Sequence, residues 1–176
     1  MAETNDSISQ NHASLARLRA LCEGLTDDNL DRSLESGWTV ATMLAHLAFW
    51  DREVTTCLLV WERLPPDEVP SRVAERTGWI NGETLAPLLR AGLSEAQVVT
   101  MSAEQINEAL APRWAHIPPR QAAEDALQAA GEIDLKLTTL DPTLRALIEK
   151  SDKAWMLVPS EHWDEHIDQI EASIGG

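Results

Sequence analysis

Two histidines near the C-terminal end of the chain have the spacing of a metal-binding pair. His162 and His166 lie four residues apart in a segment that reads as a helix. Residues i and i+4 share one helical face, so both imidazoles point the same way. Two neutral imidazoles one turn apart are a good start for a transition-metal site, which needs at least one further protein ligand. The alternative is a pair of surface histidines, which the spacing alone favours.

An apolar stripe runs beside this pair. Trp163, Ile167, Ile170 and Ile174 fall on one face of a helix expected over residues 160–174. The two histidines lie at the edge of that stripe, where a side chain is half-buried and still within reach of a small molecule. The pattern therefore predicts a helix that packs on a core through its stripe.

Other stretches with helical periodicity must form the rest of that core. Long helices are expected over residues 7–23, 39–63 and 119–140, and shorter ones over 80–90, 102–113 and 143–150. Prolines and glycines interrupt residues 64–118, which we expect to form a long connection that lines a binding cleft. No segment shows the alternation of a strand, so we predict one all-α domain over residues 1–176.

The composition excludes several classes of function. The chain has 176 residues, 44% of them hydrophobic, and a formal charge of −15. Such a negative charge disfavours nucleic acid and anionic membranes as partners. The first residues lack the basic and apolar regions of a secretory signal, and no apolar run is long enough to span a membrane. Cys22 and Cys57 are too few for a disulfide framework. We therefore expect a cytoplasmic protein.

A third histidine occupies a similar position on another predicted helix. His46 lies at the edge of the apolar face of the 39–63 helix, on the same side as Trp50, Glu53 and Cys57. In a helix bundle, ligands on facing helices converge on one site. Asp51 falls inside the apolar stripe and faces away from His46. A buried acid needs partners, so Asp51 is either a structural hydrogen-bonding residue or part of a site, and we favour the structural role.

Two segments resemble motifs of the DinB-like family, which includes relatives of mycothiol-dependent maleylpyruvate isomerase. Residues 38–51, WTVATMLAHLAFWD, resemble the second-helix signature of that family, and residues 161–170, EHWDEHIDQI, resemble its fourth-helix motif. The resemblance implies a four-helix bundle with up-down-down-up connectivity and a long, partly helical connection between its second and third helices. It also implies a divalent metal held by His46, His162 and His166.

Three imidazoles leave open coordination positions on Zn²⁺, Ni²⁺ or Fe²⁺. A bound water would become acidic enough for hydrolysis, and a bound thiol would lose its proton, as thiol transfer requires. The family includes thiol transferases and isomerases that use mycothiol, bacillithiol or glutathione. We therefore predict a metal-dependent enzyme, either a thiol transferase or isomerase or a hydrolase, that acts on a small molecule, with a low-molecular-weight thiol as a further cofactor. A non-catalytic metal-containing binding or stress-response protein is the alternative.

The remaining candidates carry weaker signals. Glu53, Glu161 and Glu165 could act as general acid or base, support the imidazoles, or be solvated helix acids. We interpret His12 as a surface or boundary residue and His116 as part of a helix end. Seven tryptophans exceed what a small helical core needs, and with the resemblance they predict a homodimer.

Overall fold

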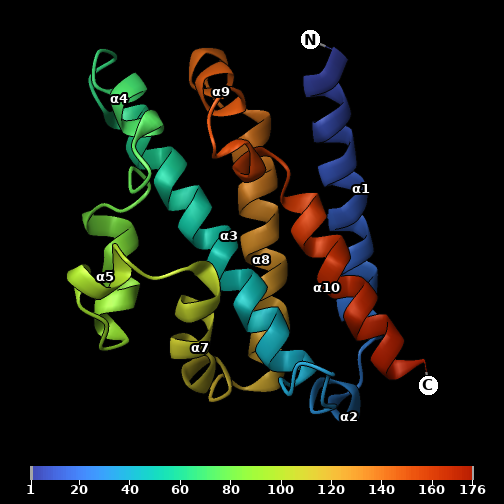
Figure 1. Cartoon of the computed structure of the whole chain (residues 1–176). Coiled ribbons are helices and arrows are strands. Elements are labelled where there is room, and N and C mark those ends of the chain that lie inside the picture. The colour runs from blue at the N-terminus through green and yellow to red at the C-terminus, as the bar shows by residue number, and fades with distance from the viewer. Residues whose placement is uncertain (1, 176) are drawn as a thin grey trace.

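The structure is a computed structural model that describes the backbone of residues 2–175 and the side chains of residues 6–175. Ten α-helices and one 3₁₀ helix make up that part of the chain, and no strand occurs within it. The prediction of an all-α protein is confirmed (Figure 1). No helix in the described part is both long enough and apolar enough to cross a membrane.

Four long helices carry the core: α1 (Ala2–Gly24), α3 (Val40–Arg63), α8 (Pro119–Thr138) and α10 (Pro159–Ile174). Helix α3 packs along α8, α1 packs against both α8 and α10, and α10 also contacts α3. Alanines keep α8 narrow where it meets its neighbours, since Ala122, Ala126 and Ala130 are fully buried. The expected bounds are close to the observed ones, except that α1 begins at Ala2.

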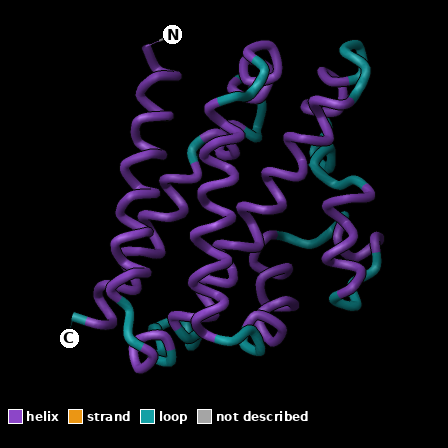
Figure 2. Tube along the Cα trace, turned by 180° about the vertical axis from the view of Figure 1, so that it is seen from behind, coloured by secondary structure: helices purple, strands orange, loops and turns teal. Residues whose placement is uncertain are grey.

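Shorter helices fill the connections between the long ones. Helix α2 (Asp27–Leu30) joins α1 to α3, and α9 (Pro142–Glu149) with the 3₁₀ helix η1 (Ala154–Leu157) joins α8 to α10. The long connection between α3 and α8 holds α4 (Val69–Ala74), α5 (Gly82–Arg90), α6 (Glu95–Val98) and α7 (Ala103–Trp114). Figure 2 shows, from behind, that loops lie mainly at the ends of the helices.

The connection is held against the core by α5 and α7, both of which contact α3. Ser102 caps α7 by accepting a hydrogen bond from the amide of Gln105, and Trp114 at the end of α7 is buried. The loop before α5 is fixed by Trp61, whose indole N–H donates to the carbonyl oxygen of Gly78 over 3.1 Å. The connection is therefore a packed part of the fold that covers one side of α3.

Candidate metal centre

Helix α3 positions His46 in its second turn. The hydroxyl of Thr39 caps the helix by accepting a hydrogen bond from the amide of Thr42 over 3.1 Å. The imidazole of His46 is only 4% exposed. It packs edge-on against the ring of Trp114, with ring centroids 5.3 Å apart, and at a tilt of 57° against the ring of Trp38, with centroids 5.4 Å apart. The two indoles leave the imidazole little freedom to turn.

Helix α10 positions the other two histidines. Pro159 occupies its first turn, where the missing N–H costs nothing. Trp163, Ile167 and Ile170 are fully buried, as the stripe predicted. The outer face of the helix is tied to α1, since Arg17 forms ion pairs with three acids of α10: Asp164, Asp168 and Glu171. These contacts fix the rotation of α10 about its axis.

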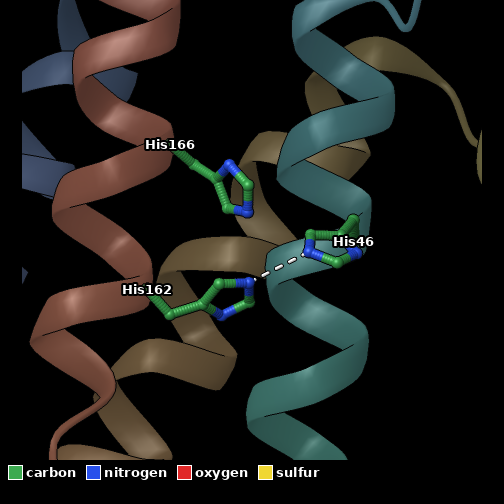
Figure 3. A group of neighbouring side chains, drawn as sticks. All are labelled: His46, His162 and His166. Atoms are coloured by element: carbon green, nitrogen blue, oxygen red, sulfur yellow. Dashed lines mark hydrogen bonds between the residues drawn. The ribbon is translucent and has the colours of Figure 1, made fainter. Parts of the chain in front are cut away.

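With that rotation, all three predicted ligands converge. Figure 3 shows the rings of His162 and His166 pointing from α10 toward His46 on α3. The Nε2 atoms of His46 and His162 lie 3.0 Å apart, and one ring nitrogen from each of the three residues lies within 4.8 Å of the others. Ring centroids are separated by 4.7 to 5.1 Å. Residues 116 positions apart in the sequence thus form one cluster.

Burial keeps these imidazoles neutral. It lowers the pKa of His46 to about 2, and the nearby His162 and His166 lower it further, while Asn107 opposes the shift. Burial, followed by the proximity of His166, lowers the pKa of His162 to about 4. The pKa of His166 is also lowered by burial, against the effects of Gln169 and Glu165. Neutral imidazole is the form that binds metals, so the cluster is ready to coordinate without losing protons.

A hydrogen bond orients the His166 ring. Its Nδ1–H donates to the side-chain oxygen of Gln169 over 3.0 Å, which leaves the lone pair of Nε2 for coordination. The amide nitrogen of Gln169 in turn donates to a carboxylate oxygen of Glu165 over 3.5 Å. Glu165 thus supports the His166 ring through Gln169.

The geometry of the cluster suits one divalent ion. Zinc–imidazole bonds are about 2.0–2.1 Å long, so two nitrogens on one ion lie about 2.9 Å apart at a right angle and about 3.4 Å apart at the tetrahedral angle. The separation of 3.0 Å between the Nε2 atoms of His46 and His162 falls in that range. Without an ion, one of the two neutral rings can carry its proton on Nε2 and donate a hydrogen bond to the other across the same distance. The three histidines therefore fit a metal such as Zn²⁺, Ni²⁺ or Fe²⁺.

The cluster opens onto a cleft of about 890 Å³. Its walls include the three histidines together with Asp51, Glu53, Glu161 and Glu165, and residues of the long connection complete them: Arg76, Trp79, Met101, Ser102, Ala103, Glu104, Ile106 and Asn107. Pockets that hold small molecules usually have volumes of about 300–1,000 Å³. The expectation that residues 64–118 line a cleft is thus confirmed.

The structure separates the other candidates from the cluster. His12 faces Asp134 of α8, with 3.2 Å between Nε2 and the carboxylate. His116 lies beyond the end of α7 and hydrogen-bonds to the carbonyl oxygen of Pro112. Asp51 is buried and accepts a hydrogen bond from the indole of Trp163, in line with the structural role favoured from the sequence.

One residue that the sequence reasoning did not single out is Asn11. It is 1% exposed and reaches from α1 to the start of α10, where its side chain donates to the carbonyl oxygen of Leu157 and accepts from the amide of Ser160. The sequence does carry a signal for this buried position, because Asn11 interrupts the helical spacing of apolar residues between Ile8 and Leu15.

Neither family models, curated proteins nor solved structures match this chain. The resemblance to the DinB-like family therefore stays a prediction that rests on the two helical motifs. The function has to be argued from the three histidines, their supporting contacts and the cleft.

Proposed function

We propose that this protein is a DinB-like metal-dependent enzyme in which His46, His162 and His166 hold one divalent ion and the adjoining cleft binds a small-molecule substrate. The observation that carries the proposal is the convergence of three neutral imidazoles on the wall of a cleft of about 890 Å³. Catalytic metal sites commonly have three protein ligands and leave a position for substrate, whereas structural zinc sites have four.

The arrangement of the long helices supports the family assignment. In Figure 1, α1 and α10 run downward while α3 and α8 run upward, and the long connection between α3 and α8 links two parallel helices. Such an order is what an up-down-down-up bundle requires. We propose this topology for the chain.

The bound ion would supply Lewis acidity at its open positions. The protein's own residues have other tasks. Gln169 holds the His166 ring, and Trp38 and Trp114 keep water away from His46. Glu161 and Glu165 line the cleft on the same helix as two of the ligands, so either can exchange a proton with a substrate there. These features suit either thiol transfer and isomerisation or hydrolysis.

Metal analysis of the purified protein and its five single His→Ala variants tests the site. We expect about one divalent ion per chain in the unaltered protein, and its loss in His46→Ala, His162→Ala and His166→Ala. His12→Ala and His116→Ala should keep the metal, because both side chains lie outside the cluster. Loss of metal in either of these two variants, or in none of the five, would contradict the proposal.

A second experiment separates the enzyme from the non-catalytic alternative. The metal-loaded protein is assayed with electrophilic substrates and mycothiol, bacillithiol or glutathione, and with esters and amides for hydrolysis. Turnover that disappears in His166→Ala would support the enzyme. Saturable binding of these compounds without any turnover would favour a metal-containing binding or stress-response protein.

A further inference from the structure

One row of side chains on α3 extends from the metal centre along the cleft. His46, Trp50, Glu53 and Cys57 follow at intervals of four, three and four residues, which keeps them on one helical face, and all four line the cleft. At 1.5 Å per residue, Glu53 lies about 10 Å from His46 along the helix axis. The cleft therefore has two chemically different positions along this row, the imidazole cluster and the carboxyl group of Glu53.

One carboxyl oxygen of Glu53 is buried without a hydrogen-bond partner among the described residues. The side chain is 5% exposed, and the unpartnered atom is Oε2. Burial raises the pKa of this carboxyl group to about 8. A buried polar atom that lacks a partner is costly and calls for an explanation, such as a ligand that is present in the working protein.

The nearest arginines do not supply that partner. Arg90 and Arg52 share with Glu53 a smaller cavity of about 270 Å³ on its other side. Arg90 acts on Glu53 through space and opposes the rise in its pKa, and Arg52 pairs with Asp125 instead. Arg76, on the wall of the main cleft, forms no ion pair with Glu53 among the described residues. The Oε2 atom of Glu53 can therefore accept a hydrogen bond from a donor group that belongs to a bound ligand.

The walls of the cleft favour a cation. The acids Asp51, Glu53, Glu104, Glu161 and Glu165 line it against one base, Arg76. The indoles of Trp50 and Trp79 lie close together, with ring centroids 6.4 Å apart, and Trp155 borders the same space. Indole faces attract cations and also cover the apolar body of a ligand.

We infer that Glu53 binds an ammonium or similar nitrogen cation of the substrate, while the opposite end of the same molecule reaches the histidine centre. This inference rests on the proposed function and adds the class of substrate to it. The substrate is an elongated amine with an apolar middle portion and a metal-binding or reactive group about 10 Å from its nitrogen. Glu53 is thereby a specificity-determining residue.

Paired synthetic ligands test this assignment. One series consists of aminoalkyl hydroxamates of increasing chain length, and the matched series carries a methyl group in place of the ammonium group. Hydroxamate binds the zinc ion in both series, so only the distant end differs. Calorimetric titration of the zinc-loaded protein at about pH 9, where Glu53 with its pKa of about 8 is ionised, should show an optimum chain length at which the amine binds roughly tenfold or more tightly than its methyl counterpart, as expected for a charged hydrogen bond.

Two variants identify the responsible carboxylate. Glu53→Gln should remove the preference for the ammonium group and leave the affinity for the methyl series unchanged. Glu104→Gln removes the same charge from an exposed position on the cleft wall and should retain most of the preference. Zinc content and circular dichroism are measured for each protein, so that a folding defect is recognised.

The outcomes separate this inference from the proposed function. Failure of the unaltered protein to bind zinc would overturn both. Zinc binding with equal affinity for the two series, or an ammonium preference that survives Glu53→Gln, would overturn the role of Glu53 and leave the metal centre standing. The comparison of the two series in the unaltered protein decides the matter even if Glu53→Gln does not fold.

Discussion

The indole N–H of Trp163 donates a hydrogen bond to the Asp51 carboxylate over 2.9 Å, inside the core between α10 and α3. Trp163 follows directly after the candidate ligand His162, and Asp51 lies five residues after the candidate ligand His46. Both side chains are at most 3% exposed. This bond therefore fixes the helix that carries His46 against the helix that carries the other two histidines, and so helps to set the separation of their imidazoles.

Replacing Trp163 with Phe should destabilise the protein. The substitution keeps an aromatic ring but leaves the buried Asp51 carboxyl group without its donor. We expect the free energy of unfolding to fall by about 1–3 kcal/mol, measured by urea denaturation of the metal-free protein. Trp155→Phe is the matched control. Trp155 is 51% exposed, so this variant should lose much less stability. Equal losses in the two variants would argue against the importance of this bond.

The stability of the metal-free protein should fall as pH rises through neutrality. Burial raises the pKa of Asp51 from 3.8 to about 7 and that of Glu53 from 4.5 to about 8. Above about pH 7 the histidines are neutral in both states, and the folded protein keeps protons on these carboxyl groups that the unfolded chain has released, so rising pH favours unfolding up to about pH 8. Below about pH 6.5 the lowered pKa values of the three clustered histidines act in the opposite direction. Urea denaturation across both pH ranges measures the two effects.

The same measurement on Asp51→Asn tests the source of that pH dependence. Asparagine cannot ionise, so between about pH 4 and about pH 7 the stability of Asp51→Asn relative to the unaltered protein should rise with pH, while the contributions of Glu53 and the histidines remain in both proteins. A stability difference that does not change with pH would show that Asp51 does not contribute.

The three clustered histidines could be picked out from the sequence because each lies in a local pattern. His162 and His166 follow helical spacing, and His46 lies at the edge of a strongly amphipathic helix that begins at a recognisable cap, Thr39. The same periodicity located the long helices. Local patterns of this kind depend on neighbouring residues only, which is why the sequence reveals them.

The cleft and its supporting contacts depend on packing between distant segments. The loop that carries Trp79 is held by the bond from Trp61 to Gly78, and a Cβ atom at Gly78 would lie 1.8 Å from the carbonyl oxygen of Arg72. No periodicity encodes such a close approach. Residues 67–70 read as a loop from the sequence, but Val69 and Pro70 begin the helix α4 (Val69–Ala74).

The homodimer stays a prediction, which light scattering can test.

Gln169 should matter for metal affinity although it is no ligand. Its side-chain oxygen accepts the Nδ1–H of His166, and loss of that support typically weakens metal binding about tenfold or more. We expect Gln169→Ala to raise the dissociation constant for zinc, measured by competition with a chelating dye. Gln128→Ala is the control, since Gln128 makes a comparable side-chain bond, to Glu132, on α8. Unchanged zinc affinity in Gln169→Ala would show that Gln169 does not support metal binding.

Asn11, on α1, supplies the side-chain cap that the first turn of α10 lacks within its own sequence. Pro159 at the start of that helix follows Val158, whose side chain has no acceptor for the free amides of the first turn. Asn11 accepts from the amide of Ser160 over 3.4 Å and donates to the carbonyl oxygen of Leu157 over 3.1 Å. Asn11→Ala leaves both backbone groups buried without their partner, and should lower the free energy of unfolding by about 1–3 kcal/mol.

The effect of Asn11→Ala should be concentrated at the first turn of α10. Hydrogen exchange of the Ser160 and Glu161 amides should accelerate more than exchange of the amides at the end of the helix. Zinc affinity should also fall, because His162 lies only two residues after Ser160. Ser14→Ala is the control: Ser14 also joins α1 to α10, through a 2.7 Å bond to Asp164, but it does not contact the first turn. Uniform acceleration along α10 in Asn11→Ala, or the same exchange pattern in Ser14→Ala, would show that Asn11 stabilises the packing of α1 rather than the start of the helix that presents the histidines.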